Sequence, residues 1–334
     1  MKILKKENQS EELTFRDVRN KLKPNFIPQK NKFSKEEGIK CVMQGIILGD
    51  VAGSKYEGMP LKNWEDPNTM DLFGRGHIFT DDTVLSIAVM DATRRMIRRH
   101  IRLQRHVINT YKKYLRKYAE QYPDCGFGGA FYRWMFDPEV PKGPYNSCGN
   151  GAAMRSGIIG AMFENVEKVM FYAYCSAMPT HPETLLGGMS VATHNHPEGI
   201  KGAIVIAVCV WMVLHGADKA QVKQYITEQY PSGNGFKING ETKLDDLIHA
   251  ENPLSTLSVI CQTTVPMAVI NFLESDSFES CLRNSMRYLC DRDTIGAISG
   301  GIAGAFYGPE ITVGGEKGER IVRNYLDEIL LKVI

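Results

Sequence analysis

The chain has 334 residues, of which 43% are hydrophobic and 23% charged, enough apolar material for one large domain or two ordinary ones. A formal net charge of +2 provides no global basic surface, so we do not expect nucleic acid as a partner. No apolar stretch reaches the roughly twenty residues that a bilayer span needs, and the N-terminus lacks the apolar segment of a signal peptide, so we expect no membrane association. The eight cysteines form no C-x-x-C pair, which predicts reduced thiols and a cytoplasmic protein.

Residues 1–36 form an extension rich in Lys, Glu, Asn and Gln, in which "KPNFIPQKNKF" is a breaker-rich linker. Phe15, Val18 and Leu22 would share one face of a short amphipathic helix. Two interpretations remain open. The extension is either a flexible, loosely docked tail or an arm that orders on contact with a partner.

The remainder, residues 37–334, is helical in pattern almost throughout, with short Gly, Pro or Asn connections and nearly no strand-like alternation. No fixed-period repeat is present, which argues against a solenoid. We therefore predict a single all-α domain. Its expected helices span residues 38–52, 82–99, 101–121, 150–163, 165–177, 183–193, 199–215, 218–229, 256–274, 277–289 and 294–306.

Two of these helices carry glycine at every fourth position. The first has Gly45, Gly49 and Gly53, and the last has Gly296, Gly300 and Gly304. Each glycine costs about 1 kcal/mol of helix propensity relative to alanine, so such stripes indicate closely approaching backbones. The first and last helices of the domain are thus expected to be neighbours.

Acidic residues recur at the ends of apolar helices. "FTDDT" places Thr80, Asp81 and Asp82 at one helix start, and "DRDT" places Asp291, Asp293 and Thr294 at another. The first glycine-striped helix ends with "GDVAGSKYEG", which carries Asp50 and Glu57. A single acidic helix start is an ordinary cap, but three converging ends need a cation. Because the donors are all oxygens, Mg²⁺, Mn²⁺ or Ca²⁺ is favoured over Zn²⁺; the alternative is neutralisation by Arg292.

Two loops carry further candidates for ligand contact. "GNG" at Gly149, Asn150 and Gly151 precedes a predicted helix, where free backbone N–H groups would suit a phosphate. "THNHPEG" contains His194, which we expect to touch a ligand. His196 and Glu198 are instead expected to brace their own loop.

Five motifs occur in an order that resembles the ADP-ribosylglycohydrolases, in particular the ADP-ribosylarginine hydrolase group. They are "GIILGDVAGSKYEG", "FTDDTVLSIAV", "GNGAAMR", "THNHPEGIKGA" and "DRDTIGAISGGIAGAFYG". The resemblance covers residues 38–308. It implies an orthogonal all-α fold with two Mg²⁺ or Mn²⁺ ions at the bottom of an ADP-ribose cleft.

The resemblance also implies roles for individual residues. The metal ligands would be Thr80, Asp81, Asp82, Asp291, Asp293 and Thr294. Glu57 matches the glutamate near the scissile ribose, so the catalytic set would be Glu57, Asp81, Asp82 and Asp293. Gly149, Asn150, Gly151 and His194 would contact the substrate. Weaker candidates are Asp50, as a support of the site, and Asp124, as an acid or base in the cleft-lining stretch 122–131.

Three positions depart from the family pattern. Leu289 and Cys290 stand where two glycines are usual, and Arg292 replaces a small residue. These changes leave the predicted ligands in place but put normal activity in doubt.

The resulting hypothesis is a hydrolase that removes mono-ADP-ribose from a modified protein, with arginine as the favoured linkage. Serine, acetyl-ADP-ribose and nucleic-acid adducts present the same ADP-ribose half. Two alternatives remain. One is an immunity protein that neutralises an ADP-ribosylating toxin by hydrolysis or by occlusion with residues 1–36. The other is an inactive ADP-ribose-binding or structural relative.

Overall fold

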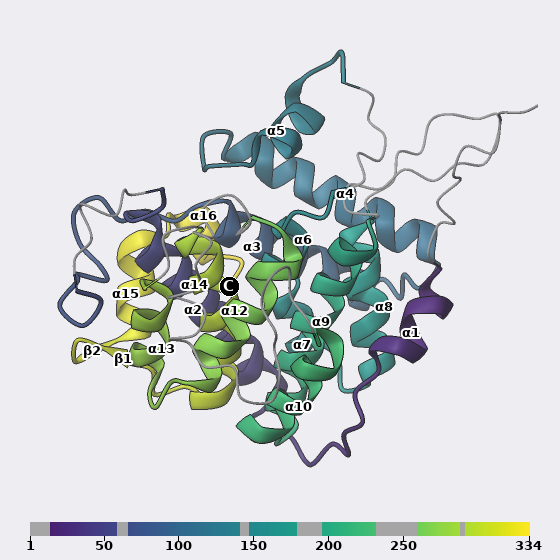
Figure 1. Cartoon of the computed structure of the whole chain (residues 1–334). Helices are drawn as coiled ribbons and strands as arrows, with labels where there is room; N and C mark the ends of the chain where they lie inside the picture. The colour runs from purple at the N-terminus through teal and green to yellow at the C-terminus, as the bar shows by residue number, and fades with distance from the viewer. Residues whose placement is uncertain (1–13, 59–65, 141–146, 179–195, 232–258, 288–290) are drawn as a thin grey trace, which may run out of the picture.

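The computed structural model describes residues 14–58, 66–140, 147–178, 196–231, 259–287 and 291–334 (Figure 1). These residues form helices and one small hairpin, in agreement with the predicted all-α class. The N-terminal half contains α1 (Phe15–Leu22), α2 (Lys35–Ser54), α3 (Asp81–Arg98), α4 (Gln104–Gln121), α5 (Gly129–Phe136), α6 (Gly151–Met154), α7 (Gly157–Met162) and α8 (Val166–Ala177). The C-terminal half contains α9 (Pro197–Leu214), α10 (Lys219–Gln229), α12 (Cys261–Leu273), α13 (Phe278–Ser285), α14 (Arg292–Tyr307), β1 (Thr312–Val313), β2 (Glu316–Lys317), α15 (Gly318–Tyr325) and α16 (Glu328–Leu331).

The two glycine-striped helices, α2 and α14, pack on each other more extensively than any other pair of described elements. They run antiparallel. A Cβ added to Gly49 would lie 1.9 Å from the Gly296 carbonyl oxygen, and one added to Gly45 would lie 2.0 Å from that of Gly300. Gly304 likewise approaches the backbone of Cys41. The prediction that the first and last core helices lie next to each other is therefore confirmed.

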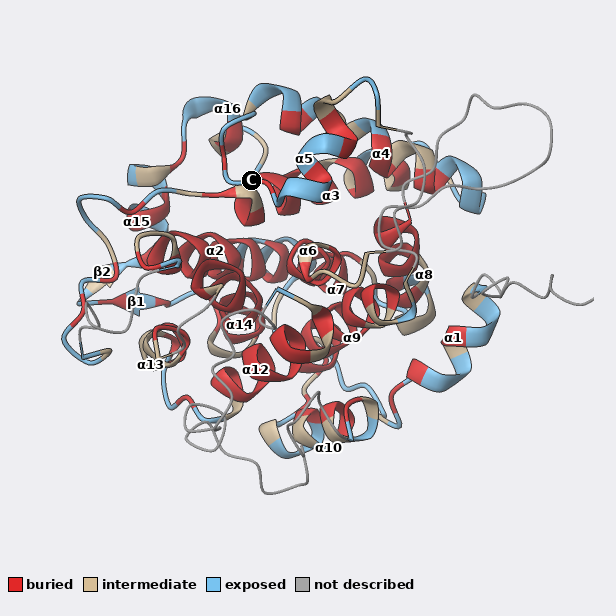
Figure 2. Ribbon diagram, turned by 45° about the horizontal axis from the view of Figure 1, so that its top comes forward, coloured by how far each residue is buried: buried red, intermediate tan, exposed pale blue. Residues whose placement is uncertain are grey.

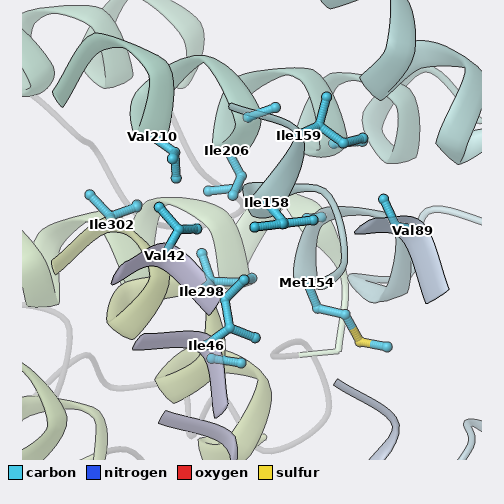
Figure 3. Close-up of a cluster of buried hydrophobic side chains, with 14 of the residues drawn as sticks. Val42, Ile46, Val89, Met154, Ile158, Ile159, Ile206, Val210, Ile298 and Ile302 are labelled. Carbon is cyan, nitrogen blue, oxygen red and sulfur yellow. The ribbon is translucent and has the colours of Figure 1, made fainter. Parts of the chain in front are cut away.

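An apolar core surrounds this helix pair, and Figure 3 shows a part of it to which α2, α3, α6, α7, α9 and α14 contribute side chains. Figure 2 shows the buried positions concentrated on α2, α9, α12 and α14, with exposed positions on the peripheral helices. The residues labelled in Figure 3 are Val42, Ile46, Val89, Met154, Ile158, Ile159, Ile206, Val210, Ile298 and Ile302. Helix α9 is long and apolar enough to span a membrane, yet 83% of its most apolar window is buried inside the protein. Its composition is that of a core helix.

Residues 14–34 of the extension pack against the helical domain. Val18 and Leu22 are buried, and the ring of Phe15 meets that of Phe171 in α8 at a centroid distance of 5.4 Å. The Tyr225 hydroxyl donates a hydrogen bond of 2.8 Å to the Leu22 carbonyl. The apolar face of α1, which a partner could otherwise have contacted, is thus covered by the helical domain. Residues 1–13 lie outside the described part.

Several elements differ from the expected ones. The helix predicted over 150–163 is divided into α6 and α7, because the Ser156 hydroxyl donates to the carbonyls of Ala153 (2.9 Å) and Ala203 (2.8 Å) and so competes with the helical backbone bonds. Helix α4 begins at Gln104 rather than at residue 101. The helix predicted over 183–193 lies outside the described residues.

The β1–β2 hairpin and helices α5, α15 and α16 are not among the predicted elements. Gly314 and Gly315, with φ of 59° and 80°, form the two-residue turn between the strands. Two consecutive residues of positive φ are typical of a type I′ hairpin turn, so the Gly-Gly pair is the sequence signal for this hairpin.

The close contact of α2 and α14 can be tested by replacing Gly49 with alanine. The added methyl group would overlap the Gly296 carbonyl, and we expect Gly49→Ala to lower the free energy of unfolding by roughly 3 kcal/mol. Urea denaturation followed by circular dichroism measures this change.

Gly38→Ala is the matched control on the same helix. Its Cβ would meet its nearest neighbour, Leu214 Cδ2, at 3.4 Å, which is ordinary contact. This variant should be unchanged or stabilised by up to about 1 kcal/mol through helix propensity. Equal losses in the two variants would contradict the close-approach interpretation.

Candidate metal centre and cleft

The α2–α14 contact brings three acidic helix ends together. Asp50 lies in the last turn but one of α2, Asp81 and Asp82 open α3, and Asp293 lies in the first turn of α14. Gly53 faces the backbone of Asp293, where a Cβ would lie 2.3 Å from the Asp293 nitrogen. The absence of a side chain at Gly53 therefore permits the acidic ends of α2 and α14 to converge.

Asp50 caps the N-terminus of α3 from a different helix. Its Oδ2 accepts hydrogen bonds from the backbone N–H groups of Thr80 (2.9 Å) and Thr83 (3.1 Å), and its Oδ1 accepts one from the Thr80 hydroxyl (2.6 Å). The N-cap Thr80 accepts no side-chain cap bond itself. Because Asp50 supplies the cap, Asp81 and Asp82 are not needed for it.

The carboxylates form two groups of three that share one member. In each group the three carboxylate oxygens all lie within 4.8 Å of one another. The first group is Asp50, Asp82 and Asp293, and the second is Glu57, Asp291 and Asp293. A shared carboxylate between two oxygen-rich groups suits a pair of hard divalent cations.

Burial and mutual repulsion disfavour the charged forms of these acids. Burial raises the pKa values of Asp81, Asp82 and Asp293 well above their usual range, and the charges of neighbouring carboxylates raise them further. Burial also raises the pKa of Asp50 despite its hydrogen bonds from Thr80 and Thr83. A bound cation would remove this repulsion.

One carboxylate oxygen of the acidic cluster is placed to bind a cation. Asp82 Oδ1 is buried and has no hydrogen-bond partner within the described residues, whereas Asp82 Oδ2 accepts a bond of 3.0 Å from the Thr294 hydroxyl. A buried carboxylate oxygen without a partner is costly unless an ion occupies the adjacent position. The alternative is that Arg292 neutralises the carboxylates in place of a cation. The Arg292 guanidinium donates a hydrogen bond to the Tyr56 carbonyl, and this contact competes with an ion pair to the carboxylates.

A pocket of about 310 Å³ opens beside the acids. Its polar lining includes Glu57, Asp81, Asp291, Asp293 and Thr294. Apolar side chains, among them Leu85, Phe131 and Val259, line other parts of it. The combination of a carboxylate-rich wall and an apolar wall suits a ligand with a polyhydroxylated part and a flat, less polar part.

Gly149, Asn150 and Gly151 line the same pocket, but their hydrogen bonds differ from the expected arrangement. The Gly149 N–H donates to the Ser147 hydroxyl (3.1 Å), and the Asn150 N–H donates to the Val259 carbonyl (2.9 Å). These two amides are therefore not free for a phosphate, which corrects that part of the expectation.

The Asn150 side chain supports the acidic centre. Its Nδ2 donates to Asp291 Oδ2 at 2.6 Å and to the Thr264 hydroxyl at 3.2 Å. Helix α6, which follows Asn150, has only four residues. Sequence reasoning missed this role because it depends on Thr264 and Asp291, which are more than 100 residues away.

The stretch 122–131, expected to line the cleft, contributes to the pocket through its glycines. Gly126, Gly128 and Gly129 line the pocket, and α5 begins there without a side-chain cap. Uncapped N–H groups of a first helical turn can bind an anion. Asp124, the candidate acid or base from the same stretch, is exposed and does not belong to the described pocket lining, which corrects its expected place. The sequence signal for the glycines of the pocket lining was the run "GFGG".

Of the remaining residues named from the sequence, some are placed by the structure and others lie outside the described residues. Thr80 is buried beside Asp50, and His196 accepts a hydrogen bond from the Glu198 N–H (3.2 Å), as expected for a brace within its loop. His194, Leu289 and Cys290 fall outside the described residues.

The raised pKa of Asp82 predicts a pH-dependent cost to the fold. Folding favours the neutral acid, so ionisation costs stability above the unfolded pKa of about 3.9, and this cost disappears as the pH falls towards that value. At pH 7 with EDTA, Asp82→Asn should raise the Tm by at least about 2 °C, equivalent to about 1 kcal/mol. Differential scanning fluorimetry measures the shift.

Exposed Asp124 provides the control, since Asp124→Asn should leave the Tm unchanged. Added Mg²⁺ should raise the Tm of the native chain more than that of Asp82→Asn. A lower Tm for Asp82→Asn than for the native chain in EDTA at pH 7 would refute the assignment.

Comparison with known proteins agrees with this geometry. The family model described as ADP-ribosylglycohydrolase matches residues 34–311. ADP-ribosylhydrolase ARH3 of Mus musculus is 25% identical over 330 residues, covering 80% of this chain and 83% of that protein. The Homo sapiens ARH3 is 25% identical over 328 residues, covering 80% and 84%.

Among solved structures, one titled "ADP-ribosylglycohydrolase-related protein complex" superimposes with a TM-score of 0.59 at 18% identity. It covers 90% of this chain and 97% of that one, which supports the fold. The matched range includes each of the described acidic residues of the centre. The chain thus belongs to the ADP-ribosylglycohydrolase family, whose members are metal-dependent hydrolases of glycosyl bonds.

Proposed function

We propose that this protein is a divalent-cation-dependent hydrolase that removes mono-ADP-ribose from modified protein side chains. The observation that carries the proposal is the pair of carboxylate groups sharing Asp293 beside the 310 Å³ pocket. Family membership supports the reaction class, and the unpartnered Asp82 oxygen supports the cation.

Two Mg²⁺ or Mn²⁺ ions are the proposed cofactors. Asp50, Asp82 and Asp293 would hold one, and Glu57, Asp291 and Asp293 the other, with Thr80, Asp81 and Thr294 as further candidate donors. When bound, such ions orient ribose hydroxyls and lower the pKa of water.

The reaction replaces the C1″ bond to the modified side chain with a bond to water oxygen. Glu57, exposed at the pocket, provides negative charge that would stabilise an oxocarbenium-like ribose. Asp81 lines the same pocket, and a proton must reach the leaving group as the C1″ bond breaks. The attacking water loses one proton and the leaving group gains one, so the overall reaction balances.

The linkage is the finer part of the proposal. Arginine remains the favoured linkage of the sequence analysis, whereas the relatives' name, ADP-ribosylhydrolase, specifies no side chain. The experiment below therefore compares arginine-linked and serine-linked conjugates.

Two further expectations stay proposals. We expect action in the cytoplasm, in keeping with the free thiols of the seven described cysteines. A toxin could be neutralised by hydrolysis or by occlusion with residues 1–36. Residues 14–34 are packed on the domain, which makes them less suited to occlude a partner.

The proposal is tested by measuring free ADP-ribose released from arginine-linked and serine-linked proteins, with Mg²⁺ and with EDTA. We expect Mg²⁺-dependent release, and a loss of at least about a hundredfold in Asp293→Asn, because Asp293 belongs to both carboxylate groups.

Asp124→Asn, a matched acid-to-amide change outside the described pocket lining, should retain the native rate. Circular dichroism of both variants would show that they are folded. Native-rate hydrolysis by Asp293→Asn would sink the metal assignment, and the absence of release from either conjugate would sink the proposed function.

A further inference from the structure

The modest net charge conceals a strongly basic segment at the far end of α3 from the acidic centre. Residues 92–119 contain ten Arg and Lys residues and no Asp or Glu. They span the end of α3, the connection to α4 and most of α4, at the periphery of the molecule (Figure 2). Since α3 has 18 residues, its two ends lie roughly 27 Å apart. This charge is thus separate from the metal centre.

A second cavity, of about 480 Å³, lies at this end of α3. We call it the basic groove. Its lining includes Lys35, Arg102, Lys168 and the imidazole of His100, and its apolar floor includes Phe163 and Tyr172. They come from α2, the α3–α4 connection, the α7–α8 connection and α8. The groove is therefore built by tertiary packing and not by one basic helix.

These four polar side chains are exposed and make no ion pair or side-chain hydrogen bond within the described part of the chain. The acid that lines the groove, Glu164, is already engaged. Its carboxylate accepts hydrogen bonds from Asn31 (3.1 Å) and lies 3.2 Å from the Nε2 of His215. The groove consequently presents a net positive charge, because Lys35, Arg102 and Lys168 outnumber its one carboxylate.

His100 occupies a backbone position that favours glycine. Its φ is 54°, the one positive value among the described non-glycine residues. The Ile101 N–H donates to the Met96 carbonyl (3.0 Å) and the His100 N–H to that of Ile97 (3.3 Å), the pattern of a Schellman motif. A side chain retained at a strained position suggests a use for it, and this one lines the groove.

We propose that the basic groove binds an acidic peptide segment of a partner protein that inserts an apolar side chain between carboxylates. Charge complementarity favours the acidic residues, and the recessed apolar floor favours the inserted side chain. Leu103 beside the groove leaves 61% of its surface exposed and extends the apolar contact. The proposal stands independently of the hydrolase function.

The floor argues against nucleic acid and membrane as occupants. The rings of Phe163 and Tyr172 stack on each other at a centroid distance of 4.4 Å, and the Tyr172 hydroxyl donates a hydrogen bond to the Ile101 carbonyl. These rings are not presented for base stacking. A concave apolar floor also differs from the protruding apolar face with which a protein enters a lipid interface.

Fluorescence anisotropy with the full chain tests the proposal. The probe is a short fluorescein-labelled peptide of glutamates flanking one leucine. We expect saturable binding that weakens at least about tenfold in the double variant Arg102→Glu and Lys168→Glu, because two attractions become repulsions. Replacing the peptide's leucine with serine should also weaken binding.

The matched control is the double variant Lys21→Glu and Lys317→Glu, which changes net charge equally at exposed positions outside the groove. It should bind the peptide as the native chain does. Equal loss in the two double variants, or tighter binding of a single-stranded oligonucleotide or phosphatidylserine vesicles than of the peptide, would overturn the proposal.

His100→Gly separates binding from folding. Glycine relieves the positive φ, so this variant should have a raised Tm and yet bind the peptide about threefold more weakly. Unchanged affinity in the stabilised variant would remove His100 from the groove's function.

Discussion

The direct contact between the backbones of α2 and α14 organises the domain. It is possible because Gly45 and Gly49 face Gly300 and Gly296 without side chains between them. The antiparallel crossing fixes the end of α2 against the beginning of α14. Residues about 240 positions apart in the chain thereby share one acidic site, and the surrounding apolar helices hold the crossing in place (Figure 3).

This arrangement concentrates negative charge where folding alone would disfavour it. Burial and neighbouring carboxylates raise the pKa values of Asp81, Asp82 and Asp293. Thr294 compensates only partly, through its hydroxyl to Asp82 and its backbone N–H to Asp293. Asp50 illustrates the opposite solution, since three donors from the start of α3 satisfy its carboxylate. Asp50 thus caps α3 and also belongs to the first carboxylate group, so one side chain serves both the fold and the proposed cation site.

The molecule carries two chemically opposite features at the two ends of α3. The acidic end begins the helix next to the pocket, and the basic end leads into the groove of Lys35, Arg102 and Lys168. A helix is a rigid spacer, so a partner held at one end keeps a fixed distance from a group in the pocket. The peptide-binding proposal gives this separation a use without changing the chemistry of the pocket.

Local periodicity and residue type were enough to predict the helical class, most helix positions, the glycine pairing and the acidic residues. The folded chain was needed to show that Asp50 caps α3, that Asn150 turns its amide to Asp291, and that Asp124 does not belong to the described pocket lining. Each of these outcomes depends on which distant donor or acceptor arrives beside a residue. Local pattern carries no information on that arrival, because packing between helices decides it.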